Sequence, residues 1–180
     1  MVCEGLGNGP LFLLQELLSR ERNAAHPLKN LGDKVSVTSE ALIKVEQLAA
    51  AAGIEGEHNL LRGEFVVLFG LPNGRSQEVF VSDTSVDPEV TVISVRSTCL
   101  VIDKGMFKGM SKPMALELLM MNEKLNFARY GVQEDEESYI VVASYDLLLN
   151  GLEPKGLAFA LECVALTADS YEEKFDQDIF

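Results

Sequence analysis

Apolar residues at helical spacing predict three helices after residue 37. The first has Thr38 or Ser39 available as N-cap and Gly53 as its end. The second begins at Ser111, with Pro113 in the first turn, where the missing N–H of proline costs no hydrogen bond. The third opens with Pro154. The apolar positions are 41, 42, 45, 48, 49 and 52 in the first helix, 118, 121, 125 and 128 in the second, and 157, 161, 164, 168, 171 and 175 in the third.

Segments rich in β-branched and aromatic residues predict five strands in two groups. Asn73 and Gly74 separate the first two strands and tolerate the positive φ that a hairpin turn demands. The third segment is too long for one straight strand, so we expect a bulge or bend near Arg96 to Thr98. A polar turn separates the fourth and fifth strands. The segments are residues 64–70, 77–83, 89–103, 130–135 and 138–149.

These elements predict an α+β fold. Their order is α-β-β-β-α-β-β-α, preceded by a short N-terminal helix. Because the strands occur in hairpin-linked groups, we expect a five-stranded antiparallel sheet with helices mainly on one face. We assign residues 38–180 to this domain and residues 1–37 to the N-terminal helix and a linker.

The N-terminal segment contains the sequence NGPLFLLQELLSRERN. Asn8 and Gly9 resemble a cap, and Pro10 suits the first turn of a short helix. The apolar positions 11, 13, 14, 17 and 18 give this helix too much apolar surface to stand alone. We therefore expect it to pack against the domain or against a second chain.

The charge of the chain is unevenly distributed. The formal net charge is −13, and residues 131–180 hold 12 acidic and 2 basic side chains. Such a surface repels phosphate backbones and anionic lipids, so we expect neither nucleic acid nor membrane as a partner. The acidic surface serves either solubility or the steering of a basic partner, and the sequence leaves both open.

Apolar runs in the chain are far shorter than the ~20 residues that cross a bilayer. The N-terminal ten residues carry an acidic residue and no basic one ahead of the first apolar run, and no small-residue cleavage site follows. These features predict a cytoplasmic protein.

Residues suited to catalysis or metal binding are few. Cys3, Cys99 and Cys163 lie far apart, without the spacing of a zinc site, and we interpret the last two as small buried hydrophobes. Apolar neighbours would raise the pKa of a thiol and oppose a Cys–His nucleophile with His26 or His58. The acidic run at 134–137 lacks the alternation of a calcium loop. We predict no catalytic, cofactor-binding or metal-ligating residues, and no cofactor.

Apolar surface beyond what the predicted core needs is more informative about function than these few residues suited to catalysis or metal binding. Five of the six methionines lie between residues 106 and 121, in or just before the second predicted helix, which is apolar on more than one face. Methionine suits either an irregular core or a surface that accepts varied partners. We therefore name a candidate partner or dimer surface, which consists of Leu14, Leu18, Met114, Leu118, Met121 and Leu125.

The C-terminal half resembles the bacterial YbjN family. The resemblance rests on Leu125-Asn126 near a helix end, Tyr130-Gly131 at the next strand, an acidic turn, the strand SYIVVASYDLLL, and a closing helix after GLEP with an Ala-Asp pair near its end. It covers residues 122–175 in local pattern and residues 38–176 in element order. The family is similar in fold to class I chaperones of type III secretion. The resemblance implies a domain that dimerises and offers sheet and helix surfaces to a polypeptide.

The expected function is therefore protein binding. We predict a non-catalytic, chaperone-like adaptor with a protein partner or client, which forms a homodimer. One alternative is a standalone regulatory domain of unknown ligand. Another is a cysteine-dependent enzyme, although no base is recognisable within reach of a nucleophile.

Overall fold

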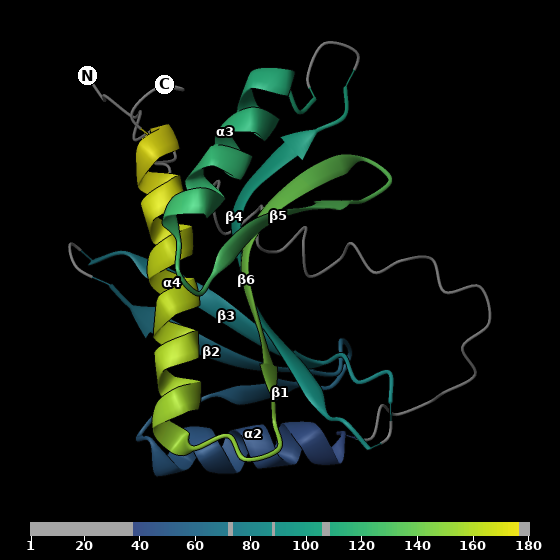
Figure 1. Ribbon diagram of the computed structural model, residues 1–180, viewed down its shortest axis with the longest axis vertical. Coiled ribbons are helices and arrows are strands. Elements are labelled where there is room, and N and C mark those ends of the chain that lie inside the picture. The colour runs from purple at the N-terminus through teal and green to yellow at the C-terminus, as the bar shows by residue number, and fades with distance from the viewer. Residues whose placement is uncertain (1–37, 72–73, 88, 106–108, 177–180) are drawn as a thin grey trace, which may run out of the picture. The chain divides into compact units, whose positions relative to one another are not determined.

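The computed structural model describes residues 38–71, 74–87, 89–105 and 109–176, which all belong to the unit running from Ser36 to Phe180. These residues form an α+β fold with a six-stranded antiparallel sheet and three helices (Figure 1). In chain order the elements are α2 (Glu40–Ala51), β1 (Glu57–Asn59), β2 (Glu64–Gly70), β3 (Ser76–Asp83), β4 (Val92–Asp103), α3 (Lys112–Lys124), β5 (Arg129–Glu134), β6 (Ser138–Leu148) and α4 (Pro154–Asp176). The predicted N-terminal helix lies outside the described residues.

The strand order in the sheet is β1-β2-β3-β4-β6-β5, and every neighbouring pair is antiparallel. The α+β class and the antiparallel sheet are confirmed, but the prediction of five strands is wrong. The additional strand, β1, has only three polar or charged residues and shows no apolar alternation. Gly56 lets the chain pass close to β2, because a Cβ there would lie 2.5 Å from the Phe65 ring.

Local signals fix the ends of the first two helices. The Ser39 hydroxyl accepts a hydrogen bond from the Leu42 N–H at 3.3 Å and caps α2, while Gly53 follows the helix with a φ of 77°. The Ser111 hydroxyl caps α3 in the same way, at 3.3 Å from the Met114 N–H, and Pro113 lies in the first turn. Both predicted helix starts are therefore confirmed.

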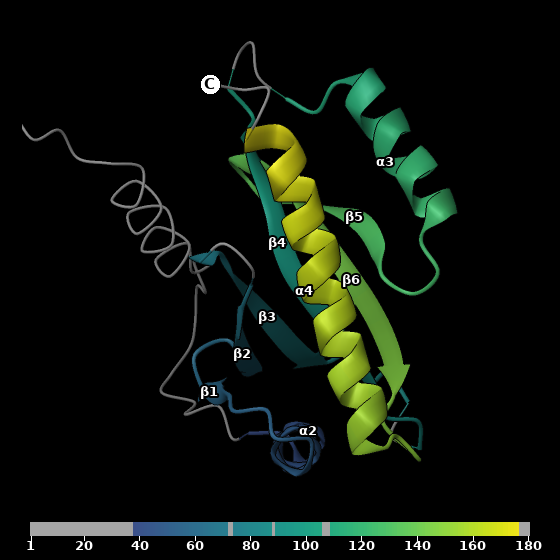
Figure 2. The same ribbon diagram turned by 90° about the vertical axis from the view of Figure 1, so that its left-hand side faces the viewer.

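The core lies between one face of the sheet and two helices. Val67 pairs with Val79, and Val81 pairs with Val95, and all four side chains are buried on the same face. Helix α4 packs against β3, β4 and β6, and α2 packs against β2, β3 and α4. Figure 2 shows α4 lying along β4 and β6. Helix α3 instead contacts β5, at the edge of the sheet.

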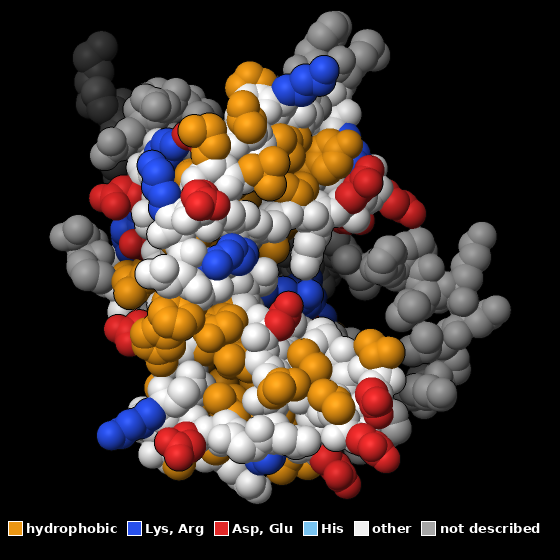
Figure 3. All heavy atoms as spheres, viewed as in Figure 1, with side chains coloured by type: hydrophobic (Ala, Val, Ile, Leu, Met, Phe, Trp, Pro, Cys, Tyr) orange, Lys and Arg blue, Asp and Glu red, His pale blue; other side chains and the backbone are white. Residues whose placement is uncertain are grey.

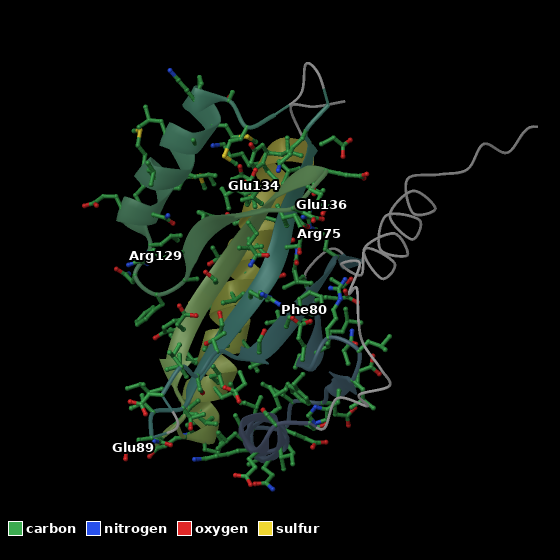
Figure 4. All side chains as sticks on the ribbon, turned by 90° about the vertical axis from the view of Figure 1, so that its right-hand side faces the viewer. Arg75, Phe80, Glu89, Arg129, Glu134 and Glu136 are labelled. Carbon is green, nitrogen blue, oxygen red and sulfur yellow. The ribbon has the colours of Figure 1, made fainter. Side chains whose placement is uncertain are left out.

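The opposite face of the sheet carries a mixed set of side chains. Glu64 is 4% exposed and forms an ion pair with Arg96 two strands away. Phe80, labelled in Figure 4, is opposite Arg96 in the β3–β4 register, and Leu68 on the same face is 66% exposed. Among the described residues, charged and apolar groups therefore alternate on this face.

Strand β4 contains the irregularity expected from its length. The β4–β6 register shifts between Thr98 and Leu100, so the bulge lies at the C-terminal limit of the predicted interval. An extra residue at a bulge bends the strand and increases its twist. Cys99, at the bulge, is buried in the core.

Candidate functional site

The outward face of α3 is apolar. Leu119 and Met120 lie three and four residues after Leu116, and Leu116, Leu119 and Met120 are 58%, 67% and 61% exposed. The helix is held on its other side by β5 and by an ion pair between Glu117 and Lys174 of α4. These contacts leave the face with the three large side chains in solvent.

The predicted partner surface therefore contains a residue from the wrong face of α3. Leu118 is 4% exposed and belongs to the core, and Met121 and Leu125 are partly buried and pack against it. Met114 is also partly buried. The sequence shows two apolar faces on this helix, and only tertiary packing decides which of them turns inward. Leu14 and Leu18 lie outside the described residues.

An aromatic cluster adjoins the C-terminal end of α3. Phe127, in the α3–β5 connection, packs edge-on against Phe159 of α4, with ring centroids 4.9 Å apart at an interplanar angle of 88°. The Phe127 ring also lies 6.0 Å from that of Tyr145 on β6. Phe127 and Phe159 remain 47% and 46% exposed, so the cluster is ordered by its own contacts but faces solvent.

Together these side chains make a candidate binding surface. We define the α3/α4 apolar surface as Leu116, Leu119, Met120, Phe127, Phe159 and Leu166, of which Leu166 is a further exposed residue of α4. Figure 3 shows apolar side chains in two groups, one over α3 and one below it over the lower half of α4, with polar and basic side chains between them. Exposed apolar area rimmed by polar groups is typical of protein interaction sites.

Charged side chains border the surface. Glu123 and Lys124 follow Met120 on α3, and Glu162 lies between Phe159 and Leu166 on α4, all of them exposed. A polar rim around a few large apolar side chains is the usual composition of a non-obligate protein interface. The geometry therefore favours association with a polypeptide.

The sequence contains a signal for these residues. Leu116, Met120 and Phe127 fall off the predicted stripe of α3, and Phe159 and Leu166 fall off the single seam of α4. Such residues are apolar without a place in the predicted core. Their exposure follows from the packing of the inward faces of both helices, which the sequence alone does not fix.

The two cysteines of the described residues differ. Cys99 is buried as predicted, and burial, with a smaller contribution from the Glu172 charge, raises its pKa to about 12. Cys163 is only partly buried, so the prediction of a buried core residue is wrong for it. It lies four residues after Phe159 and three before Leu166, and therefore on the same side of α4 as these exposed residues.

A thiol with such a raised pKa is protonated at neutral pH, which disfavours Cys99 as a nucleophile. His58 contacts the carboxylate of Glu46, with Nε2 and Oε2 3.2 Å apart. Its other ring nitrogen is buried without a protein partner, beside a pocket of about 10 Å³, roughly the space of one water molecule. This pocket is too small for an organic substrate.

Side chains that could share a metal ion are not clustered in the described part of the chain, where no group of three or more His, Cys, Asp or Glu has a suitable arrangement. Within the same ranges, no helix combines the length and apolar character needed to cross a bilayer. The α3/α4 apolar surface is thus the feature of the described residues that most favours a function.

Comparison with known proteins does not assign the chain to a family. No protein-family model matches it, and no curated protein matches it.

Proposed function

We propose that the chain is a non-catalytic protein-binding module, a chaperone-like adaptor that contacts a protein partner or client through the α3/α4 apolar surface. One observation carries the proposal: two ring-packed phenylalanines and four aliphatic side chains from two helices are about half exposed or more. Surfaces that bind proteins concentrate their energy in a few large side chains of this kind.

The energetics favour occupancy of the surface. Complete burial of a Leu, Met or Phe side chain contributes about 1.5–3 kcal/mol relative to exposure. Because Phe127 and Phe159 already restrict each other, little of that gain is lost in ordering them on binding. A partner covering Leu119, Phe127 and Phe159 would therefore gain affinity from side chains that are already in place.

Resemblance to the YbjN family motivates the words "chaperone-like". The order α2-β2-β3-β4-α3-β5-β6-α4 contains the α-β-β-β-α-β-β-α order of that resemblance, with β1 as an addition. We propose membership of a YbjN-like group, a cytoplasmic location and a homodimeric state on the same basis. The acidic surface supports a partner with basic surroundings, because charge complementarity accelerates encounter.

Site-specific photo-crosslinking in cells tests the function. A benzophenone amino acid replaces Leu119 or Phe159, and in a matched control it replaces Glu78, an exposed polar residue of β3 that is paired with Leu68 on the opposite sheet face. We expect one defined protein to be crosslinked from the two surface positions and not from the control. The crosslinked protein is then purified and its affinity measured.

Affinity measurements decide whether the α3/α4 apolar surface makes the contact. Phe127→Asp should weaken binding by about tenfold or more, because it places a charge in the interface. Leu68→Asp, an equally drastic change at an exposed apolar residue of the opposite sheet face, should leave it unchanged. Equal crosslinking from Glu78, or full affinity in Phe127→Asp, would instead favour a standalone regulatory domain.

A further inference from the structure

Strand β5 forms one edge of the sheet, with β6 as its neighbour in the described part of the chain. An edge strand presents main-chain N–H and C=O groups on its outer side, where another strand can pair with them. In antiparallel pairing these groups point alternately inward and outward along the strand. An added strand could therefore pair only with those β5 residues whose main-chain groups point outward.

The contacts of Asn122 in α3 show that the main-chain groups of Tyr130 point outward. The Asn122 side-chain carbonyl accepts a hydrogen bond from the Tyr130 N–H at 2.7 Å, and its side-chain amide donates one to the Tyr130 carbonyl at 3.0 Å. These are the two bonds that a residue of a paired strand would make. The main-chain groups of Tyr130 thus point away from β6, and one side chain of α3 replaces a partner strand at this position.

Alternation then assigns the rest of the strand. Val132 and Glu134 lie two and four residues after Tyr130, so their main-chain groups also point outward. The inward bond from the Asp135 N–H to the Ser138 carbonyl, at 2.9 Å in the adjoining turn, agrees with this assignment. In the described part of the chain no strand covers the outer side of Val132 and Glu134, and the Val132 side chain is 43% exposed.

The open end of this edge is acidic. Glu134, Glu136 and Glu137 are exposed at the β5–β6 turn, and Figure 4 shows Glu134 and Glu136 near one end of β5 and Arg129 near the other. Lys104 is the cation beside them, with its Nζ 2.6 Å from Glu134 Oε1 and 2.5 Å from the Asp135 carbonyl oxygen. The local excess of carboxylates favours a basic partner.

We propose that the outer edge of β5 accepts an extended basic segment of another polypeptide as an added strand. The segment pairs with the outward groups of Val132 and Glu134, with an apolar side chain opposite Val132 and a Lys or Arg opposite Glu134. Asn122 ends the pairing at Tyr130 and so sets the register. This site lies at the sheet edge and is independent of the α3/α4 apolar surface.

Self-pairing of two β5 strands fits the edge less well. A two-fold axis at Val132 would place Glu134 of one copy opposite Tyr130 of the other, whose outward groups are already bonded to Asn122. Only the central Val132 pair could then form both ladder bonds. A two-fold axis at Gln133 would pair Val132 with Glu134 in both directions, but it would bring the acidic residues Glu134 and Glu136 of the two copies together. A heterologous basic segment avoids both conflicts.

A synthetic peptide provides the direct test. The probe has the sequence Thr-Lys-Thr-Lys-Thr-Val-Thr-Val-Thr, with blocked ends, and the control peptide carries Glu in place of both Lys. Titration of the labelled full-length protein is followed by NMR. We expect saturable binding of the Lys peptide below about 1 mM, with the amide signals of Val132 and Glu134 shifted, and much weaker binding of the Glu peptide.

Variants of Val132 identify the main-chain contact. Val132→Pro removes an N–H that is not part of the β5–β6 ladder, and proline is tolerated on such edges. We expect Val132→Pro to weaken binding of the Lys peptide by about tenfold. Val132→Thr keeps the N–H and the branched shape, so its affinity for the Lys peptide should be within about threefold of that of the unchanged protein. Circular dichroism confirms that each variant is folded.

Charge reversal keeps the test decisive if Val132→Pro does not fold. Glu134→Lys should bind the Glu peptide in preference to the Lys peptide. An unchanged preference, shifts confined to the α3/α4 apolar surface, or Lys-peptide binding unaffected by Val132→Pro in a folded protein would overturn the β5 assignment. None of these results bears on crosslinking at Leu119 or Phe159, so the two proposals fail separately.

Discussion

The hydroxyl of Tyr130 donates a hydrogen bond to the main-chain carbonyl of Thr167 at 2.9 Å, which joins β5 to α4 across the core. The two groups are 37 residues apart in the chain. The Tyr130 ring also packs against that of Tyr171, with centroids 5.1 Å apart, and burial raises the pKa of Tyr130 to about 12. The same residue is bonded to Asn122 through its main chain, so it connects β5 with both α3 and α4.

Removal of this hydroxyl should destabilise the domain. Tyr130→Phe keeps the ring but deletes the donor to Thr167, and a hydrogen bond of this type contributes about 1 kcal/mol. We expect the free energy of unfolding in urea to fall by about that amount. Tyr145→Phe is the matched control: it deletes an oxygen from a partly buried tyrosine of β6 and should change stability by less than about 0.5 kcal/mol. Equal losses in both variants would show that the Thr167 bond has no special contribution.

Because the Cys99 thiol is buried, we expect the domain to lose stability at alkaline pH. Its pKa rises from the ordinary value of 9.0 to about 12, chiefly because of burial. The unfolded chain therefore releases this proton at lower pH than the folded chain. The stabilisation is fully present below pH 9.0 and is lost as the pH rises towards about 12, by up to about 1.4 kcal/mol per pH unit.

Comparison with Cys99→Ala isolates this contribution. At neutral pH the variant should be less stable by about 1–3 kcal/mol, because it truncates a core side chain. Since alanine does not titrate, the difference from the unchanged protein should shrink above pH 9.0 in urea unfolding. Tyr130 and Tyr171 also have raised pKa values, so some alkaline slope remains in the variant. A constant difference between the two proteins from neutral pH to about pH 10 would contradict the assignment.

Sequence patterns predicted the elements whose signals are local. Ser39 and Ser111 cap helices because each hydroxyl accepts a hydrogen bond from the main-chain N–H three residues later in the chain. This contact is local and does not depend on the rest of the fold. The β2–β3 and β5–β6 hairpins follow from turn residues between short apolar strands. Strand β1 was missed because Glu57–Asn59 is a strand only through pairing with β2, which gives the segment no pattern of its own.

The candidate surface depends on information that is not local. Leu118 and Leu119 are neighbours of the same type, yet one is 4% and the other 67% exposed. Their difference arises from where β5 and α4 lie around α3, through contacts such as Asn122 with Tyr130 and Glu117 with Lys174. The sequence indicated surplus apolar area on α3 correctly but could not assign it to a face.

Thiol accessibility distinguishes the two cysteines experimentally. In a Cys3→Ser background, a maleimide reagent should label Cys163 of the folded protein well before Cys99, because only Cys163 is partly exposed. Peptide mass spectrometry after timed quenching gives both rates. Equal rates under native conditions, or faster labelling of Cys99, would show that the core around the β4 bulge opens readily and would revive the cysteine-dependent enzyme as a hypothesis.

Self-association would cover the outer face of α3. Leu116, Leu119 and Met120 would be an aggregation liability if they stayed in water, and the net charge of −13 offsets this only in part. A two-fold contact is the commonest arrangement that covers such a patch, because the same surface serves both copies. In the purified protein, where no client occupies this surface, we therefore expect a homodimer in light scattering across a concentration series.

Substitutions on the outer face of α3 test whether it forms the dimer contact. Leu119→Asp should shift the protein towards the monomer, whereas Leu68→Asp on the opposite sheet face should not. Met121→Asp is a poor substitute, because Met121 is partly buried against the core and a charge there would destabilise the domain as well. Leu14→Asp examines the N-terminal segment, whose apolar residues are the other predicted contact. If the unchanged protein is monomeric at every concentration, or a dimer persists in both Leu119→Asp and Leu14→Asp, then self-association does not cover these residues, and the α3/α4 apolar surface is left to a different polypeptide.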